Sequence, residues 1–288
     1  MIIDSHTHLF TPDIVAKVSA NRDLVAALGL QTGRALRRMG TASLVSEATA
    51  GGVDACLLLP VANENNVERV NTSFRAVTQG NAHLVPAGSL HPRFSGNREE
   101  LDTLRSHGTR TIKLCSFSQE FSTDAVETIR LLDLISDANG RDLSPFFVLI
   151  DTFCKADRYF GTPAAYLTTP HRLGRLVAAY PDIVFVAAHM GGLGAACDEV
   201  LRHLPPRPNL YLETSNGAHT FTPDEFCRIA AAHGPDRIVF GTDWPWFGQA
   251  EEIDTVDALL ARAGFSVRER ARVFGGNMAA LLGIGINS

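Results

Sequence analysis

A regular alternation of short apolar runs with helical stretches constrains the fold of this chain more than any other feature. Several runs, such as 146–150 and 184–188, are apolar at nearly every position. Strands of this kind, buried on both faces, are typical of a parallel sheet covered by helices. Strands are expected at Ile2–Ser5, Ala55–Leu59, Leu84–Gly88, Thr111–Leu114, Phe146–Ile150, Val184–Ala188, Leu210–Glu213 and Ile238–Phe240. The alternation predicts an α/β fold.

The segments between these strands have the apolar spacing of helices. Helices are expected at Val67–Thr78, Arg98–His107, Asp124–Asn139, His171–Tyr180, Pro223–His233 and Glu251–Ala263. Two longer segments interrupt the alternation: an insertion of about residues 10–50 after the first strand, with helices at 13–28 and 43–50, and a loop at 152–170 after the fifth. Long loops after barrel strands commonly cover or line a substrate site.

The placement of polar side chains distinguishes a closed barrel from an open sheet. Polar residues stand at or just past the ends of different strands, namely His6, His8, Lys113, Asp151, His189, Glu213 and Asp243. An open sheet gathers its ligand residues mainly at one switch point, whereas a barrel gathers them from many strands onto one face. We therefore predict a single (β/α)8 TIM barrel, with residues 1–288 as one domain.

Composition excludes several classes of function. The net charge is −5, and without a Lys/Arg-rich run nucleic acid is not an expected partner. The apolar runs are too short to span a bilayer, so no membrane partner is expected. The five cysteines are scattered without a C-x-x-C pair, which argues against a disulfide framework and a thiolate zinc site. The N-terminal segment has no signal-peptide pattern, so a cytoplasmic location is expected.

Two histidines at the end of the first strand give the sharpest chemical signal. Because side chains alternate along a strand, His6 and His8 point to the same side, with Cα atoms roughly 6–7 Å apart. That spacing lets two imidazoles bind one metal ion. A histidine pair can also end a strand for packing alone, but here it opens a strand–helix alternation, which favours a metal site.

Two further strand ends carry groups suited to proton transfer. Asp243 follows the last strand and could complete a metal site and take a proton from water, although an acid before Pro245 can also serve as a helix cap or turn residue. His189 follows a buried strand and precedes two glycines that let a substrate approach. We assign it as a general acid or carbonyl-polarising group.

Other polar residues are expected to contact the substrate. Lys113 ends the fourth strand and is expected to bind a substrate carboxylate, to become carbamylated, or to form a plain ion pair. Glu213 is expected either behind a ligand histidine or at the substrate. Trp244 is expected to line the pocket, and His91, just past the third strand, is a further substrate contact.

Together the segments 6–8, 112–114, 188–192 and 241–245 resemble the amidohydrolase superfamily, in its branch of amidohydrolase-related metal-dependent hydrolases and decarboxylases. The resemblance covers nearly the whole chain. It implies a (β/α)8 barrel with one divalent metal, zinc before manganese or magnesium, held by His6, His8 and Asp243. Where the family usually has a ligand histidine at the end of the fifth strand, this chain has Asp151. It is expected either as a harder fourth ligand or as a residue that faces the substrate at a site with weak or no metal.

Several functions remain open from the sequence. The leading hypothesis is hydrolysis of a small organic acid, amide or lactone by an activated water, with Asp243, His189 and Lys113 as catalytic residues. The same residues would also suit decarboxylation, a lactonase without metal, or a silent barrel that binds a ligand. The expected partner is a small-molecule substrate. A homo-oligomer is a further expectation, because barrel enzymes often assemble into symmetric oligomers.

Overall fold

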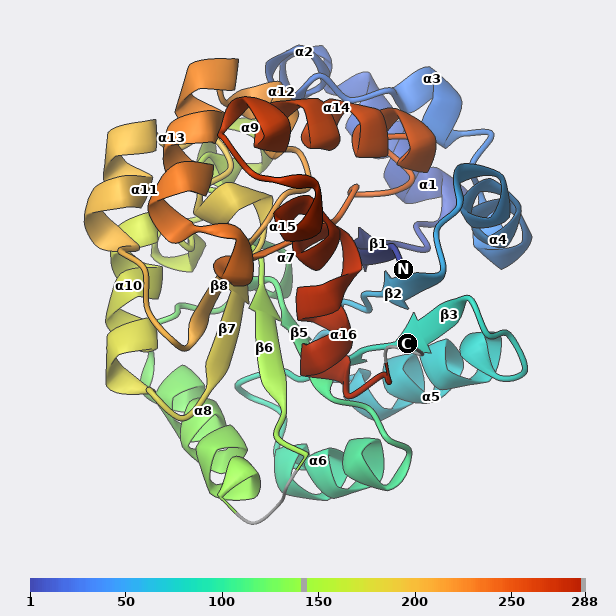
Figure 1. The fold of residues 1–288 in the computed structure, drawn as a ribbon. Helices are drawn as coiled ribbons and strands as arrows, with labels where there is room; N and C mark the ends of the chain where they lie inside the picture. Colours follow the sequence, from blue (N-terminus) through green and yellow to red (C-terminus); the bar gives the residue numbers. More distant parts are fainter. Residues whose placement is uncertain (141–143, 286–288) are drawn as a thin grey trace.

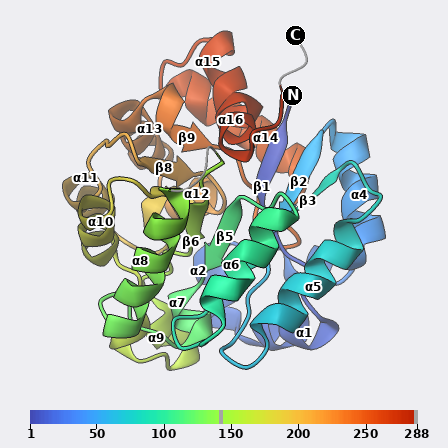
Figure 2. The same cartoon turned by 90° about the horizontal axis from the view of Figure 1, so that it is seen from below.

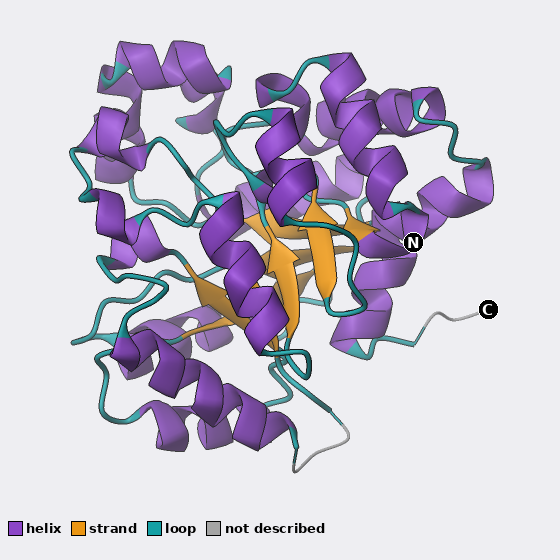
Figure 3. Cartoon of the chain, turned by 90° about the vertical axis from the view of Figure 1, so that its left-hand side faces the viewer, coloured by secondary structure: helices purple, strands orange, loops and turns teal. Residues whose placement is uncertain are grey.

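The computed structural model describes residues 1–140 and 144–285, with parallel strands at the centre and helices around them (Figures 1 and 3). The strands are β1 (Ile3–Thr7), β2 (Ala55–Leu58), β3 (Leu84–Pro86), β4 (Gly88–Ser89), β5 (Thr111–Leu114), β6 (Phe147–Ile150), β7 (Val184–Ala187), β8 (Leu210–Glu213) and β9 (Ile238–Val239). Each predicted strand is found within two residues of its expected ends, and the third is divided into β3 and β4 at Ala87.

Hydrogen bonds between the first and last strands join the two sheets into a barrel. The sheets run β1-β2-β3 and β4-β5-β6-β7-β8-β9, with every pair parallel. Ser5 N donates to Phe240 O over 2.9 Å, and Thr7 forms a parallel bridge to Trp244. The predicted α/β TIM barrel is therefore confirmed, and the carboxyl ends of all strands meet on one face.

Helices form the outer layer of the barrel (Figure 2). They are α5 (Val67–Thr78), α6 (Asn97–Ser106), α7 (Ser116–Gln119), α8 (Val126–Asn139), α10 (Pro170–Ala179), α11 (Cys197–His203), α13 (Pro223–His233), α14 (Gln249–Arg262), α15 (Val267–Ala271) and α16 (Asn277–Leu282). The short helices α7, α11, α15 and α16 were not predicted, because segments of four to seven residues carry too little periodicity to be recognised.

The insertion after β1 is helical throughout much of its length. It contains α1 (Pro12–Ala20), α2 (Arg22–Leu28), α3 (Thr32–Ala35) and α4 (Gly40–Gly51). The single helix expected at 13–28 is two helices, because Asn21 ends α1 and caps α2 by accepting from Leu24 N at 3.1 Å.

The insertion meets the loop after β6 above the barrel mouth. That loop holds α9 (Ala156–Phe160), and α12 (Gly217–Thr220) follows β8 and contacts α2 of the insertion. One apolar cluster joins the two long segments, with Val15, Leu24 and Leu28 from the insertion against Phe153 and Leu167 from the loop. The insertion and the loop therefore form a common roof over the carboxyl ends of the strands.

Among the described residues, no helix is both long enough and apolar enough to cross a membrane.

Candidate metal centre and active site

The two histidines of the first strand converge on one point. His6 Nε2 and His8 Nε2 are 3.1 Å apart, and both rings are buried. The opposite nitrogens are engaged by acceptors: His6 Nδ1 lies 2.7 Å from Glu213 Oε2, and His8 Nδ1 lies 3.1 Å from Leu59 O. Donation from both Nδ1 atoms leaves each Nε2 with a free lone pair. Two lone pairs that face each other at this distance repel unless a cation or proton lies near them.

Asp243 adds a carboxylate to this pair of nitrogens. Its Oδ1 is 3.9 Å from His6 Nε2 and 3.7 Å from His8 Nε2. Its Oδ2 accepts from Asn216 Nδ2 at 3.3 Å, which turns the first oxygen toward the histidines. The backbone of Asp243 is left-handed, with φ of 61°, because the chain turns sharply as it leaves the strand. Burial raises the pKa of Asp243 to about 6.

These three residues fit a divalent metal. One ligand atom from each lies within 4.8 Å of those of the other two. Two nitrogens that bind one ion at about 2.0–2.1 Å lie about 3 Å apart when the angle between them is near 90°. Burial lowers the pKa of both His6 and His8 well below the ordinary value, so both rings are neutral, as a ligand requires.

A second group of possible ligands shares His6. It consists of His6, His189 and Glu213. The 2.7 Å contact between His6 Nδ1 and Glu213 Oε2 is a short hydrogen bond, and a proton therefore occupies the space that a metal would need. Glu213 is better described as the residue that orients the His6 ring.

His189 and Asp151 form an ion pair opposite the two ligand histidines. His189 Nε2 lies 3.3 Å from Asp151 Oδ2, and the rings of His189 and His6 have centroids 5.0 Å apart. Burial alone would lower the pKa of His189, but the hydrogen bond and charge of Asp151 raise it to about 9. Burial likewise opposes the ionised form of Asp151, yet His189 holds its pKa below the ordinary range. The pair therefore carries a proton that can be donated.

The sharp turn at His189 depends on the residues that follow it. His189 and Met190 have positive φ of 57° and 53°. A Cβ on Gly191 would lie 2.8 Å from the side chain of Leu204, and one on Gly192 would lie 2.8 Å from Ala195. The two glycines, noted in the sequence as room for a substrate, are thus needed for close packing of the turn.

Lys113 presents a buried cation to the same space. It ends β5 with 1% of its surface exposed, and its Nζ has no hydrogen-bond partner among the described residues. Its charge acts on His6, His8 and Asp151, which places it in the same electrostatic environment. A buried ammonium without an acceptor is costly, so the site is suited to an anionic group of a ligand.

Two residues expected at the substrate have other contacts. Both ring nitrogens of His91 bind the backbone: Nε2 lies 2.8 Å from Gln119 O, and Nδ1 accepts from Arg93 N at 3.2 Å. Trp244 is fully buried in an apolar cluster beneath α4, and its Nε1 donates to Glu47 Oε2 at 3.1 Å. The structure therefore brings together His6, His8, Lys113, Asp151, His189, Glu213 and Asp243, and it gives His91 and Trp244 structural contacts.

Three residues to which the sequence assigned no role help to build the site. Ser215 contacts His6, His189 and Glu213 through its hydroxyl group, and Asn216 orients Asp243. A Cβ on Gly241 would lie 2.1 Å from Glu213 Oε1, so only glycine fits there. The sequence did offer one signal for Ser215: it is a polar residue two positions after Glu213, the acid that ends its strand.

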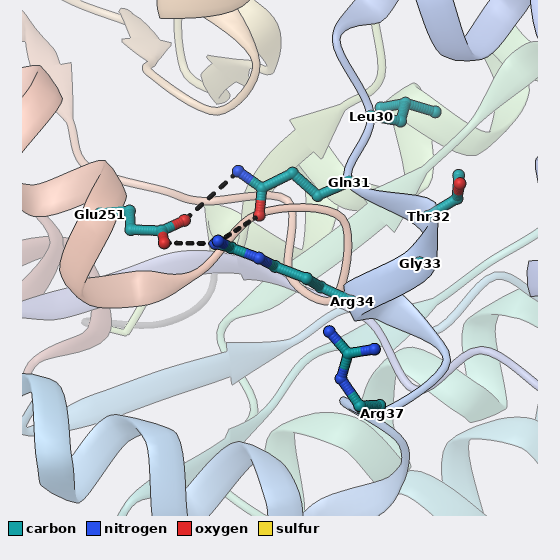
Figure 4. A pocket seen from close by; sticks show the side chains of 7 residues that line it. All are labelled: Leu30, Gln31, Thr32, Gly33, Arg34, Arg37 and Glu251. Atoms are coloured by element: carbon teal, nitrogen blue, oxygen red, sulfur yellow. Dashed lines mark hydrogen bonds and ion pairs between the residues drawn. The ribbon is translucent and has the colours of Figure 1, made fainter.

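The roof leaves the site nearly closed. Phe10 from the insertion stacks on His8 with ring centroids 4.7 Å apart, and it also contacts Trp246 at 5.4 Å. A hollow of about 600 Å³ lies instead between the insertion and α14, lined by residues that include Gln31, Arg34 and Glu251 (Figure 4). Arg34 binds Glu251 and Gln31 there, and none of the residues that line this hollow belongs to the candidate site.

Comparisons with known proteins support the fold and the family. The amidohydrolase family model matches residues 139–284, about half of the chain. No curated protein matches the chain.

Among solved structures, similar chains include an uncharacterised TIM-barrel protein from Bordetella bronchiseptica (20% identity, TM-score 0.73, 98% of each chain covered). Others are an amidohydrolase from Burkholderia multivorans (17%, 0.69, 99% of this chain and 100% of that chain) and 5-carboxyvanillate decarboxylase from Sphingomonas paucimobilis (15%, 0.67, 99% of each). At these identities the likeness shows a shared fold.

Proposed function

Because this chain belongs to the amidohydrolase family, we propose that it is a metal-dependent hydrolase that acts on a small organic acid, amide or lactone. One observation carries the proposal: the free Nε2 atoms of His6 and His8 converge beside the Asp243 carboxylate. We propose zinc as the metal, since it accepts two imidazoles and a carboxylate, with manganese or magnesium as alternatives if Asp151 is a fourth ligand.

The metal would supply Lewis acidity, both to polarise the substrate carbonyl and to lower the pKa of a water molecule. Asp243 takes the proton from the attacking water, because its carboxylate faces the same point as the two ligand nitrogens. The water oxygen bonds to the carbonyl carbon. The bond from that carbon to the leaving nitrogen or oxygen then breaks, and the leaving atom takes a proton from His189.

Lys113 favours a negatively charged substrate. Its unpartnered Nζ binds a carboxylate of the substrate and holds the reacting carbonyl against the metal-binding residues. Because the site residues are nearly fully buried, the roof excludes bulk water while the substrate is bound, which strengthens this charge interaction.

Metal content and turnover together test the proposal. The purified chain should contain about one equivalent of divalent metal by mass spectrometry, and His6→Ala should lose it. Hydrolysis in H₂¹⁸O should place one ¹⁸O atom in the acid product. A chain that contains no metal and also gains none from added zinc would contradict the proposal and favour the lactonase that needs no metal.

Decarboxylation is a second candidate, favoured by the combination of the unpartnered Lys113 cation with a protonated His189. In that reaction the bond between the carboxylate carbon and the substrate carbon breaks, CO₂ leaves, and His189 protonates the carbanion. Release of ¹³CO₂ from a carboxyl-labelled substrate, without ¹⁸O in the remaining acid, would identify this reaction instead of hydrolysis.

A further inference from the structure

Asp4 lies two residues before His6 on β1, yet its side chain lies on the other side of the strand. The register between β1 and β2 shifts between Asp4 and Thr7, where three steps along β1 match two along β2. Such a bulge leaves one residue unpaired and re-aims the side chains that follow it. Asp4 therefore faces Gln249 of the outer helix α14, while His6 faces the mouth of the barrel.

The carboxylate of Asp4 joins the two parts of the chain that carry candidate metal ligands. Its Oδ1 accepts from the backbone N–H of His6 at 3.1 Å and from that of Thr242 at 3.0 Å. His6 is itself a candidate ligand, and Thr242 directly precedes Asp243. A single oxygen atom thus holds the backbone of β1 against the segment that follows β9.

The second oxygen of Asp4 extends this contact to the far side of Asp243. Oδ2 accepts from the Thr242 hydroxyl at 2.7 Å, and that hydroxyl accepts from Trp244 N at 3.1 Å. The residues before and after Asp243 are therefore both connected to Asp4, with the left-handed backbone of Asp243 between them. A further donor, Gln249 Nε2 at 2.8 Å, holds the same oxygen.

We propose that Asp4 is a positioning residue that fixes His6 and Asp243 relative to each other, so that their side chains can bind one divalent metal ion. Asp4 is fully buried, and the groups that reach it are donors. An apolar side chain at this position would leave the backbone N–H groups of His6 and Thr242 buried without an acceptor, which is costly. The inference deepens the proposed function, on which its metal-binding part rests, whereas the contacts themselves do not depend on that function.

Two matched substitutions test the contact without a change of charge. Thr242→Val removes the hydroxyl between Asp4 and Trp244 N. Thr7→Val removes a buried hydroxyl from β1, between the two histidines, where it donates to Leu57 O at 2.8 Å. We expect the dissociation constant for Zn²⁺, measured on the full-length protein by competition with a chromogenic chelator, to rise about 10-fold in Thr242→Val and to stay within about twofold in Thr7→Val. An unchanged constant in Thr242→Val, or an equal rise in both variants, would overturn the proposal.

Substitutions of Asp4 itself separate its role as an acceptor from its charge. In Asp4→Asn the amide oxygen faces the two backbone N–H groups and the amide NH₂ faces Thr242 Oγ1. Rotation of the Gln249 amide then lets its Oε1, which has no hydrogen-bond partner among the described residues, accept from the same NH₂. We expect Asp4→Asn to bind Zn²⁺ nearly as the wild type does and Asp4→Ala to bind it about 10–100-fold more weakly. Equal losses in the two variants would overturn the proposal, because the charge alone would then account for the effect.

A core variant separates positioning from a general loss of stability. Leu132→Ala opens a cavity behind α8, outside the group of candidate site residues. It should lower the Tm and leave the dissociation constant for Zn²⁺ unchanged. A rise as large as that in Asp4→Ala would overturn the proposal. If Asp4→Ala does not fold, the comparison of Thr242→Val with Thr7→Val decides.

Hydrogen exchange in metal-free protein separates the failure of this proposal from the failure of the proposed function. We expect Asp4→Ala, or Thr242→Val if the former does not fold, to accelerate exchange at the backbone N–H groups of His6 and Thr242. Leu59 N, which donates to Thr7 O at 2.9 Å, is the control and should exchange as in the wild type. A wild type that binds no Zn²⁺ would contradict the proposed function. Unchanged exchange at both His6 and Thr242 would overturn the role of Asp4.

Discussion

Asp151 Oδ2 and His189 Nε2 lie 3.3 Å apart, and both side chains are buried just past the ends of neighbouring strands, β6 and β7. The carboxylate that stands where the family usually has a ligand histidine is thus paired with the proposed general acid. It lies outside the group formed by His6, His8 and Asp243. Its role as a fourth ligand remains a prediction that a charge-removing substitution can test.

We expect Asp151→Asn to keep about one equivalent of metal, because the asparagine removes no member of the three-residue group. The kcat should fall by up to roughly 10²–10⁴-fold, the contribution of general acid catalysis, because His189 loses its carboxylate partner. Metal content by mass spectrometry and kcat measure the two effects. His8→Ala is the matched control and should lose the metal. Loss of metal from Asp151→Asn as well would establish Asp151 as a ligand.

Asp243→Asn keeps the size of the side chain but removes the base. Asn216 still has an oxygen to donate to, so the fold should be preserved and the circular dichroism spectrum unchanged. We expect kcat to fall by at least about 10²-fold, the lower end of what a positioned base contributes. Wild-type turnover in this variant would remove Asp243 from the mechanism.

The meeting of the three candidate metal ligands could be predicted from sequence because their strands end on one face of the barrel. In a parallel barrel every strand ends on the same face, so His6, His8 and Asp243 had to meet there once the strands were recognised. The apolar runs identify segments that are buried, and the strands of a barrel must be buried. The same argument located Lys113 at the mouth of the barrel.

Ser215 and Trp244 show what the sequence could not provide. The role of Ser215 depends on β8 lying between β7 and the β1–β9 closure, which brings His189 and His6 to one hydroxyl, and no local pattern encodes that distance. Trp244 follows Asp243 directly, but the backbone of Asp243 is left-handed, with φ of 61°. The chain turns there, so the carboxylate faces the site while the indole packs beneath α4.

Gly241→Ala should disturb the site by packing alone. Its new methyl group would lie 2.1 Å from Glu213 Oε1, and a shift of the carboxylate would break its hydrogen bonds to His6 and Ser215. We expect a loss of about 1–3 kcal/mol in the free energy of unfolding and weaker metal binding, since Glu213 orients His6. Gly33→Ala, where no atom lies within 4 Å, is the control and should change neither quantity. Normal metal affinity in Gly241→Ala would show that Glu213 can orient His6 without a glycine at position 241.

His233 should make stability depend on pH at a point remote from the site. Burial lowers the pKa of His233 to about 4 from the ordinary 6.5, so the folded protein takes up this proton at a lower pH than the unfolded chain does. As pH falls from 6.5 to 4 the unfolded state takes up more protons, and stability is lost. The loss attributable to this residue is at most about 3 kcal/mol.

Urea unfolding of His233→Leu at pH 7 and pH 4.5 measures this contribution. The variant should lose less stability between the two pH values than the wild type does. His107→Gln, a change at an exposed helix end, should behave as the wild type does. An equal loss in His233→Leu and the wild type would assign the acid sensitivity to other groups.

Trp244→Phe separates a structural role from a substrate contact. The indole Nε1 donates to Glu47 Oε2 at 3.1 Å, and Glu47 Oε1 accepts from Gln249 N, so the pair ties the insertion to the segment after Asp243. Loss of one such hydrogen bond should cost about 1 kcal/mol in the free energy of unfolding, with KM unchanged. Glu47→Gln removes the charge from the other side and should lower stability similarly. A several-fold rise in KM for Trp244→Phe, without one for Glu47→Gln, would show instead that the indole contacts the substrate, as its position beside Asp243 in the sequence predicts.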